Sequence, residues 1–137
     1  RADLVISPFI LLRGKIMARN KVLIVDDEVD ITETLAYILQ TKGFKPITAT
    51  DGLDCIKKVS SENPDIILLD IKMPVMDGYD VCDSVRKNIK TKSIPIIIVT
   101  SSGDTDSIVK AHKVGASDYI VKPFNIPTLL QKMRKYI

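Results

Sequence analysis

Five polar side chains in this sequence directly follow short apolar runs. The run Val-Leu-Ile-Val leads into Asp26 and Asp27, Ile-Ile-Leu-Leu leads into Asp70, and two later runs lead into Thr100 and Lys122. Short apolar runs rich in β-branched residues are typical of buried parallel strands, and the carboxyl ends of such strands meet at one edge of a sheet. The sequence therefore predicts three carboxylates, a hydroxyl and an ammonium group gathered at that edge.

Three carboxylates held close together repel one another unless their pKa values rise or a cation neutralises them. Oxygen ligands at a solvent-open site suit Mg²⁺, which takes one or two carboxylates and keeps several waters, and Mn²⁺ has similar ligand preferences. We therefore expect a divalent-cation site at Asp26, Asp27 and Asp70, with Mg²⁺ as the first choice and Mn²⁺ as the alternative.

The same side chains are suited to phosphoryl transfer. The sequence contains neither G-x-x-x-x-G-K-[S/T] nor G-x-G-x-x-G, so a glycine-rich loop is not expected to hold a phosphate. Lys122 can neutralise one phosphoryl oxygen and Thr100 can donate a hydrogen bond to another, while an aspartate attacks phosphorus to form an acyl phosphate. The predicted chemistry is phosphoryl transfer onto a carboxylate.

The elements that must position these groups alternate along the chain from Met17 onward. Strands are predicted at 22–25, 45–49, 66–69, 96–99 and 118–121. Between and after them, apolar residues at helical spacing predict helices, among them 107–114, 128–136 and one that carries Val81, Cys82, Val85 and Ile89. Five such strand–helix units require parallel pairing through right-handed crossovers. The predicted fold class is α/β, a doubly wound five-stranded parallel sheet with helices on both faces.

Composition limits the possible function classes. The chain has 137 residues, 45% of them hydrophobic and 27% charged, which is typical of one soluble globular domain. No run approaches the roughly 20 apolar residues of a membrane span, and no basic cluster indicates direct nucleic-acid binding. Cys55 and Cys82 lack a C-x-x-C spacing and fall in expected helices, so we interpret them as buried fillers. A reducing cytoplasm and no membrane partner are expected.

The first 16 residues differ from the rest of the chain. They form an apolar stretch with Pro8, and Met17 follows as a start codon would. We expect 1–16 to be a vector-derived or linker leader and 17–137 to be the domain. A signal peptide or a membrane-surface helix is the alternative, but one basic residue precedes the apolar stretch and no small-residue cleavage site follows it.

Four motifs in this order resemble the receiver domain of two-component response regulators: V-D-D-E, L-L-D-I-K-M-P-x-M-D-G, I-V-T-S and Y-I-V-K-P-F. The resemblance extends over Lys21 to Ile137. It implies a flavodoxin-like fold with the strand order 2-1-3-4-5 of the chemotaxis regulators. It also implies a cis Lys122–Pro123 bond.

The resemblance implies a role for each site residue. Asp70 would be the phosphoacceptor, and Asp27, Asp70 and the backbone carbonyl of Lys72 would bind Mg²⁺, with Asp26 supporting the metal largely through water. Lys122 and Thr100 would contact the phosphoryl group.

Further roles implied by the resemblance concern the response to phosphorylation. The rotamer of Tyr119 would follow Thr100, and the surface formed by the fourth helix, fifth strand and fifth helix, about 107–136, would change. Lys72 and Ser102 lie where the family tunes hydrolysis, and we expect Lys72 to shield the phosphoryl group from water.

The implied function is a phosphorylation-activated signalling switch of a phosphorelay, not a turnover enzyme. The phosphoryl donor would be a sensor histidine kinase, a histidine phosphotransfer protein or acetyl phosphate, and the switch would act on a downstream protein or on an output domain outside this sequence. Two alternatives remain. A Mg-dependent aspartyl-phosphate phosphatase is disfavoured because Ile71 and Lys72 follow Asp70 in place of a D-x-D motif. A constitutive docking domain would keep the fold without using the site.

Overall fold

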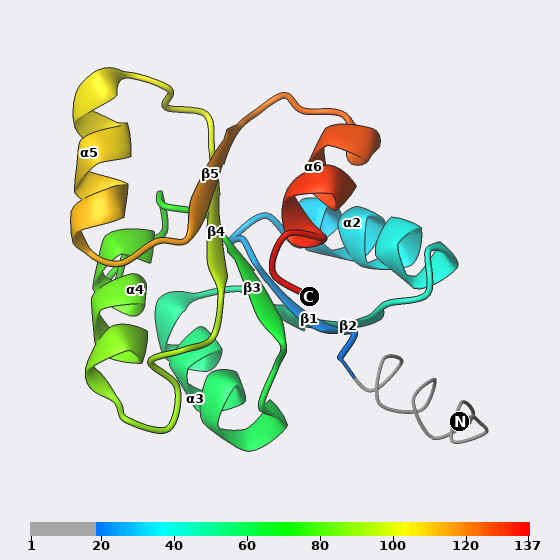
Figure 1. Cartoon of the computed structure of the whole chain (residues 1–137), viewed down its shortest axis with the longest axis horizontal. Coiled ribbons are helices and arrows are strands. Elements are labelled where there is room, and N and C mark those ends of the chain that lie inside the picture. Colours follow the sequence, from blue (N-terminus) through cyan, green and yellow to red (C-terminus); the bar gives the residue numbers. More distant parts are fainter. Residues whose placement is uncertain (1–18) are drawn as a thin grey trace.

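The computed structural model of the chain describes residues 19–137, in which strands and helices alternate (Figure 1). The strands are β1 (Lys21–Val25), β2 (Lys45–Ala49), β3 (Ile66–Leu69), β4 (Ile96–Thr100) and β5 (Asp118–Val121). The helices are α2 (Val29–Thr41), α3 (Gly52–Glu62), α4 (Gly78–Lys87), α5 (Thr105–Lys113) and α6 (Ile126–Met133). The predicted leader, 1–16, lies outside the described residues.

The strands form one parallel sheet in the order β2-β1-β3-β4-β5, as predicted. The last residue of β1, Val25, pairs with Ala49 of β2 on one side and with Leu69 of β3 on the other. At the other end of the order, Thr100 of β4 pairs with Val121 of β5. Because all strands run in the same direction, the residues that follow them share one edge of the sheet.

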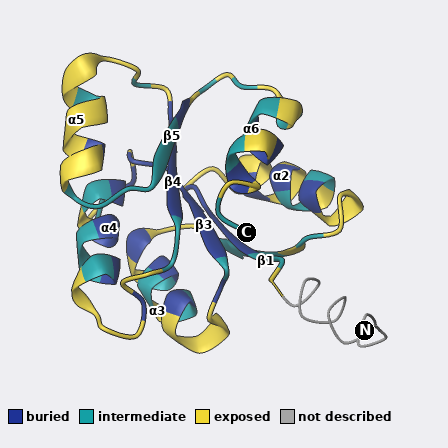
Figure 2. Cartoon of the chain, in the orientation of Figure 1, coloured by how far each residue is buried: buried dark blue, intermediate teal, exposed yellow. Residues whose placement is uncertain are grey.

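Helices cover both faces of the sheet: α2 and α6 lie on one face, and α3, α4 and α5 lie on the other (Figure 1). Successive strand residues point to opposite faces, so Val22 and Ile24 pack with α2 and α6. Leu23 and Val25 pack with α3 and α4. Figure 2 shows the result, with the central strands β1, β3 and β4 buried and much of α5 exposed. The sheet therefore separates two apolar layers and is a rigid support for its carboxyl edge.

Side-chain caps determine where four of the helices begin. Each capping oxygen accepts a hydrogen bond from a backbone N–H three residues later, and the caps are Asp51, Asp77, Asp104 and Asn125. The caps at Asp104 and Asn125 start α5 at Thr105 and α6 at Ile126, earlier than the predicted starts at 107 and 128. The predictions placed each start near the first apolar residue of the pattern, whereas the cap decides where the backbone becomes helical.

The prediction that Ile89 belongs to the apolar face of its helix is wrong. Val81, Cys82 and Val85 are buried as expected, but α4 ends at Lys87 and Ile89 is 80% exposed. The cause is Asn88, whose extended backbone ends the helix one residue before Ile89.

Two smaller predictions are confirmed. Cys55 and Cys82 are buried free thiols, and burial raises their pKa values to about 12 and about 11, which keeps both protonated. The Lys122–Pro123 peptide bond is cis.

Within 19–137, no helix combines the length and the apolarity that crossing a membrane requires.

Candidate functional site

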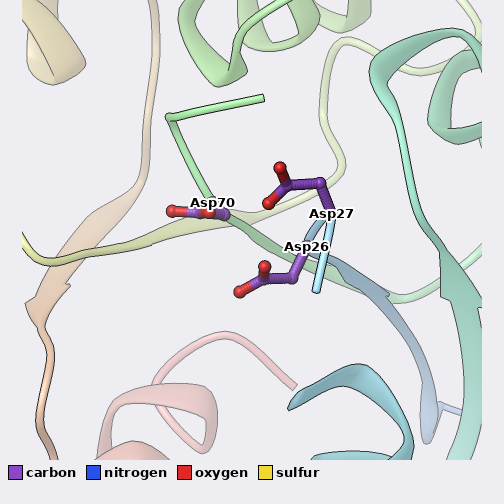
Figure 3. Close-up of side chains that lie close together, drawn as sticks. All are labelled: Asp26, Asp27 and Asp70. Carbon is purple, nitrogen blue, oxygen red and sulfur yellow. The ribbon is translucent and has the colours of Figure 1, made fainter. Parts of the chain in front are cut away.

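Three aspartates meet at the carboxyl edge of the sheet, as the sequence predicted. Asp26 and Asp27 follow β1 and Asp70 follows β3, and each offers a carboxylate oxygen within 4.8 Å of the others (Figure 3). Asp26 and Asp70 are 3% and 8% exposed, whereas Asp27 is open to solvent. Two of the three carboxylates are thus held inside the edge of the core, and the third faces the side from which a ligand can enter.

Lys122 brings a positive charge to this group from the end of β5. Its Nζ donates a hydrogen bond to Asp26 Oδ2 at 2.7 Å and lies 3.8 Å from Asp70 Oδ1. Burial lowers the pKa of Lys122, but the hydrogen bond to Asp26 and the charges of Asp70 and Asp26 outweigh burial and raise it. Lys122 is therefore charged at neutral pH.

The carboxyl group of Asp70 has a raised pKa. Burial raises the pKa of Asp70 from 3.8 to about 6; the charge of Lys122 opposes this rise, and the charge of Asp26 adds to it. The N–H of Ile71 donates a hydrogen bond to Asp70 Oδ1 at 2.9 Å, which also favours the ionised form. One lysine does not balance three carboxylates, so the site keeps a preference for a further cation.

The donor set fits a hard divalent cation. All three side chains offer carboxylate oxygens, and no histidine or cysteine is part of the cluster. Oxygen ligands of this kind, partly open to water, are those that Mg²⁺ prefers. A bound cation would also neutralise the repulsion from Asp26 and Asp27, which adds to the rise that burial causes in the pKa of Asp70.

The loop 71–77 lies against the end of β3 because Gly78 permits a close approach. A Cβ on Gly78 would overlap the carbonyl oxygen of Asp70 and lie 2.8 Å from the Cα of Ile71. The Gly78 N–H donates to the Ile71 carbonyl at 2.8 Å, which closes the loop. Lys72, two residues after Asp70, is exposed in this loop.

Thr100 and Ser102 lie on the neighbouring strand end. Thr100 is 1% exposed, and the Ser102 N–H lies 3.4 Å from Thr100 Oγ1. The Ser102 hydroxyl donates to Asp104 Oδ2 at 2.6 Å. The Lys122 N–H also donates to the Thr100 carbonyl at 2.8 Å, so the ends of β4 and β5 are joined beside the acids.

Tyr119 shares a sheet face with Thr100. Tyr119 pairs with Ile98, and Thr100 pairs with Val121, which makes Thr100 and Tyr119 diagonal neighbours on that face. The Tyr119 hydroxyl is buried and has no hydrogen-bond partner among the described residues.

Sequence reasoning missed two features of the site. It did not predict that Lys122 pairs with Asp26, because nothing local indicates which of three acids a distant lysine contacts. It also missed the network around Asp104, although the S-G-D-T-D-S stretch carries the signal of a helix cap.

Comparison with known proteins places this geometry in a family. The family model of the response regulator receiver domain matches residues 22–134. The alkaline phosphatase synthesis transcriptional regulatory protein PhoP of Bacillus subtilis is 39% identical over 106 residues, which cover 77% of this chain and 43% of that protein. The chain spans about half the length of the curated relatives it matches.

Solved structures of chemotaxis proteins and response regulators have a fold similar to that of this chain. The chemotaxis protein CheY4 of Vibrio cholerae is 34% identical with a TM-score of 0.81, covering 85% of this chain and 98% of its own. The response regulator TrrA of Thermotoga maritima, solved in complex with Mg²⁺-BeF, is 36% identical with a TM-score of 0.77, covering 86% of this chain and 99% of its own.

The family match extends over most of the chain, and the strand order and the acidic cluster at the sheet edge agree with it. The chain therefore belongs to the response regulator receiver domains of two-component systems.

Proposed function

We propose that Asp70 of this chain accepts a phosphoryl group and that the chain acts as a phosphorylation-activated switch. The observation that carries the proposal is the meeting of Asp26, Asp27 and Asp70 within 4.8 Å, with the ammonium of Lys122 3.8 Å from Asp70. Receiver domains are signalling switches and not turnover enzymes. We assign the domain to residues 17–137, a range that includes the residues matched by the family model.

The chemistry follows from the positions of the side chains. A carboxylate oxygen of Asp70 attacks phosphorus, the bond from phosphorus to the donor nitrogen or oxygen breaks, and the donor leaves with that electron pair. Lys122 neutralises one phosphoryl oxygen, and Thr100 donates its hydroxyl proton in a hydrogen bond to another. Because Asp70 is partly buried, its oxygen is poorly hydrated and needs little desolvation before attack.

Receiver domains bind Mg²⁺ at their acidic pocket, and here Asp27, Asp70 and the backbone carbonyl of Lys72 would hold it, with Asp26 supporting it through water. Mg²⁺, or Mn²⁺ in its place, supplies charge neutralisation for the incoming phosphoryl group. The ion pair between Asp26 and Lys122 then neutralises the charge of Asp26, which the metal would contact only through water.

An apolar groove beside the site supports a protein donor, a histidine kinase or a histidine phosphotransfer protein. The groove measures about 480 Å³ and is lined by α2, the segment after Lys122 and the start of α6, among them Ile31, Leu35, Ile38, Phe124 and Ile126. A donor that docks there brings its phosphohistidine toward Asp70. Ile31→Ser should therefore slow phosphorylation by a phosphotransfer protein but not by acetyl phosphate.

Phosphorylation would act on a downstream protein, or on an output domain that lies outside this sequence, through the surface around 107–136. We place this chemistry in the cytoplasm, where histidine kinases and ATP are available to it.

Incubation with Mg²⁺ and acetyl phosphate, followed by intact-mass spectrometry, tests the proposal. We expect the mass of one added phosphoryl group in the wild type and none in Asp70→Asn. Asp27→Asn should lower the Mg²⁺ affinity by about tenfold or more, because it removes a carboxylate ligand.

Two outcomes would replace the proposal. Absence of phosphorylation under conditions that modify another receiver domain would favour the constitutive docking domain. Multiple turnover on a phosphomonoester, lost in Asp70→Asn, would favour the Mg-dependent phosphatase.

A further inference from the structure

Tyr79 connects the helix behind the acidic site with the helix that follows Thr100. It lies in the first turn of α4, directly after Gly78, which packs on the backbone of Asp70. Its hydroxyl donates to the carbonyl of Ser107 at 3.3 Å, and the ammonium of Lys110 lies 4.5 Å from the centre of its ring. Both partners belong to α5, which lies beside α4 on one face of the sheet (Figure 1).

Ser107 is the residue at which this contact meets the segment after Thr100. The Ser107 Oγ lies 3.0 Å from Ser102 Oγ and 3.0 Å from Asp104 Oδ2. Ser102 in turn contacts Thr100 Oγ1 through its backbone N–H. The first turns of α5 are therefore held from two sides, by the capping network of 102–107 and by Tyr79.

Tyr119 has a buried hydroxyl that finds no hydrogen-bond partner among the described residues. Tyr79 and Tyr119 pack against the same apolar cluster. Burial raises the pKa of the Tyr119 hydroxyl, and the proximity of Tyr79 and Asp104 adds to the rise. A buried hydroxyl without a partner is unfavourable, so contacts elsewhere must keep the Tyr119 ring in this position.

We propose that Tyr79, through its contacts with Ser107 and Lys110, is a positioning residue that holds α5 over Tyr119. It thereby stabilises the conformer in which the Tyr119 hydroxyl is buried, which we call the conformer with the buried ring. Without these contacts the first turns of α5 can move away from α4, and the Tyr119 hydroxyl can then reach water. The equilibrium between the buried and the exposed ring would shift toward the exposed ring.

The effect on phosphorylation rests on the proposed function. Thr100 and Tyr119 are diagonal neighbours on one sheet face, so a Thr100 side chain that turns toward a phosphoryl group on Asp70 leaves more room for the ring. The conformer with the buried ring is therefore the one that accepts phosphate. Residues that stabilise it should speed phosphorylation without contacting the phosphoryl group.

The test measures the ring position and the chemistry separately. The first readout is fluorine NMR of protein labelled with 3-fluorotyrosine, with the Tyr119 signal identified by its loss in Tyr119→Phe. The second is the rate of phosphorylation by acetyl phosphate at saturating Mg²⁺, and the third is the dissociation constant for Mg²⁺.

Three variants remove the contacts in steps. Tyr79→Phe removes the bond to Ser107 and keeps the ring under Lys110, Lys110→Gln removes the cation, and Tyr79→Leu removes both contacts. We expect the buried population and the phosphorylation rate to fall by about twofold in each of the first two and by roughly five- to tenfold in Tyr79→Leu. Mg²⁺ affinity should stay within about twofold, because none of the variants touches the acids.

Tyr37→Leu is the matched control, since Tyr37 is 70% exposed on α2, on the opposite face of the sheet. It should change none of the three readouts. If Tyr79→Leu fails to fold, the double variant Tyr79→Phe with Lys110→Gln removes the same contacts and keeps the aromatic volume.

The outcomes separate this proposal from the proposed function. An unchanged Tyr119 signal in Tyr79→Leu, or in the double variant, would overturn the positioning role. The role would also be overturned if the wild type is phosphorylated and Tyr79→Leu shows a smaller population of the buried Tyr119 ring but an unchanged phosphorylation rate. If the wild type accepts no phosphate, the proposed function fails, while the NMR signal still decides whether Tyr79 positions Tyr119.

Discussion

The ammonium of Lys122 donates a hydrogen bond to Asp26 at 2.7 Å although 96 residues separate them in the sequence. In the fold they are close because β5 and β1 end at the same edge of one parallel sheet. The pair has two consequences. It balances the most buried acid of the site, and it keeps the lysine 3.8 Å from Asp70, where it can move to a phosphoryl oxygen with little change of its own position.

The acidic site should make the folded state less stable as the pH rises. The pKa of Asp70 is raised by burial from 3.8 to about 6, so between these values the folded protein binds more protons than the unfolded chain. Stability then falls through this window, by about 1 to 2 kcal/mol after allowing for the solvent exposure of the site. Asp70→Asn should remove this part of the pH dependence.

Urea denaturation at pH values below and above this window, with a chelator present, measures the effect. Added Mg²⁺ should raise stability at the higher pH in the wild type, because it neutralises the acids of the folded state. Equal pH slopes in the wild type and Asp70→Asn would contradict the assignment of the effect to Asp70.

Lys72 should control how long a phosphoryl group survives. It is exposed two residues after Asp70, and its long side chain can cover the acyl phosphate on the solvent side. Lys72→Ala should accelerate loss of phosphate by about two- to fivefold, because water reaches phosphorus more easily. The decay of the phosphorylated mass after removal of acetyl phosphate gives the rate. Lys90→Ala, in an exposed loop after α4, is the control and should lose its phosphoryl group at the rate of the wild type. An unchanged rate of loss in Lys72→Ala would refute the shielding role of Lys72.

The sequence could predict the strands and the gathering of acids because both depend on local patterns. Runs such as Ile66–Leu69 are short, apolar throughout and rich in β-branched residues or leucine, which fits a strand buried on both faces, and an aspartate after such a strand lies at the sheet edge. Helix starts were less accurate, since the cap at Asp104 comes before the apolar pattern begins. Ile89 fitted the helical spacing but lies beyond the end of α4.

Contacts between distant residues could not be predicted from the sequence. The choice of Asp26 as the partner of Lys122, and of Ser107 as the acceptor for Tyr79, depends on how strands and helices are placed relative to one another. A single sequence specifies which side chains are polar, but the distances between them are set only once the sheet and its two helical layers have formed.

Val75 should be a destabilising residue in its present position. Its φ is 68°, in the left-handed region that β-branched residues rarely adopt. Its side chain is 98% exposed, so no hydrophobic burial offsets the strain. Val75→Asn should raise the free energy of unfolding by about 1 kcal/mol, because asparagine tolerates this conformation. Val109→Asn on α5, 45% exposed and helical, is the control and should leave stability unchanged or lower it. A loss of stability in Val75→Asn would disprove the strain.

Arg86 should contribute more to stability than any other surface-reaching side chain of α4. Its guanidinium donates hydrogen bonds to the carbonyls of Gly115, Ile94 and Lys92 at 2.8, 2.7 and 3.2 Å, and to Ser117 Oγ at 3.3 Å. These acceptors lie in the segments before β4 and β5, so a single side chain fixes how both strands enter the sheet.

Arg86→Ala should lower the free energy of unfolding by about 2 to 3 kcal/mol, since half-buried carbonyls lose a charged donor. Arg86→Lys should recover only part of this, because an ammonium cannot reproduce the planar fork of donors. The neighbouring Lys87 forms an exposed ion pair with Asp83, so Lys87→Ala should change the free energy of unfolding far less than Arg86→Ala does. Chemical denaturation of the three variants measures the differences, and equal losses in Arg86→Ala and Lys87→Ala would show that the hydrogen bonds of Arg86 do not hold the two strand entrances.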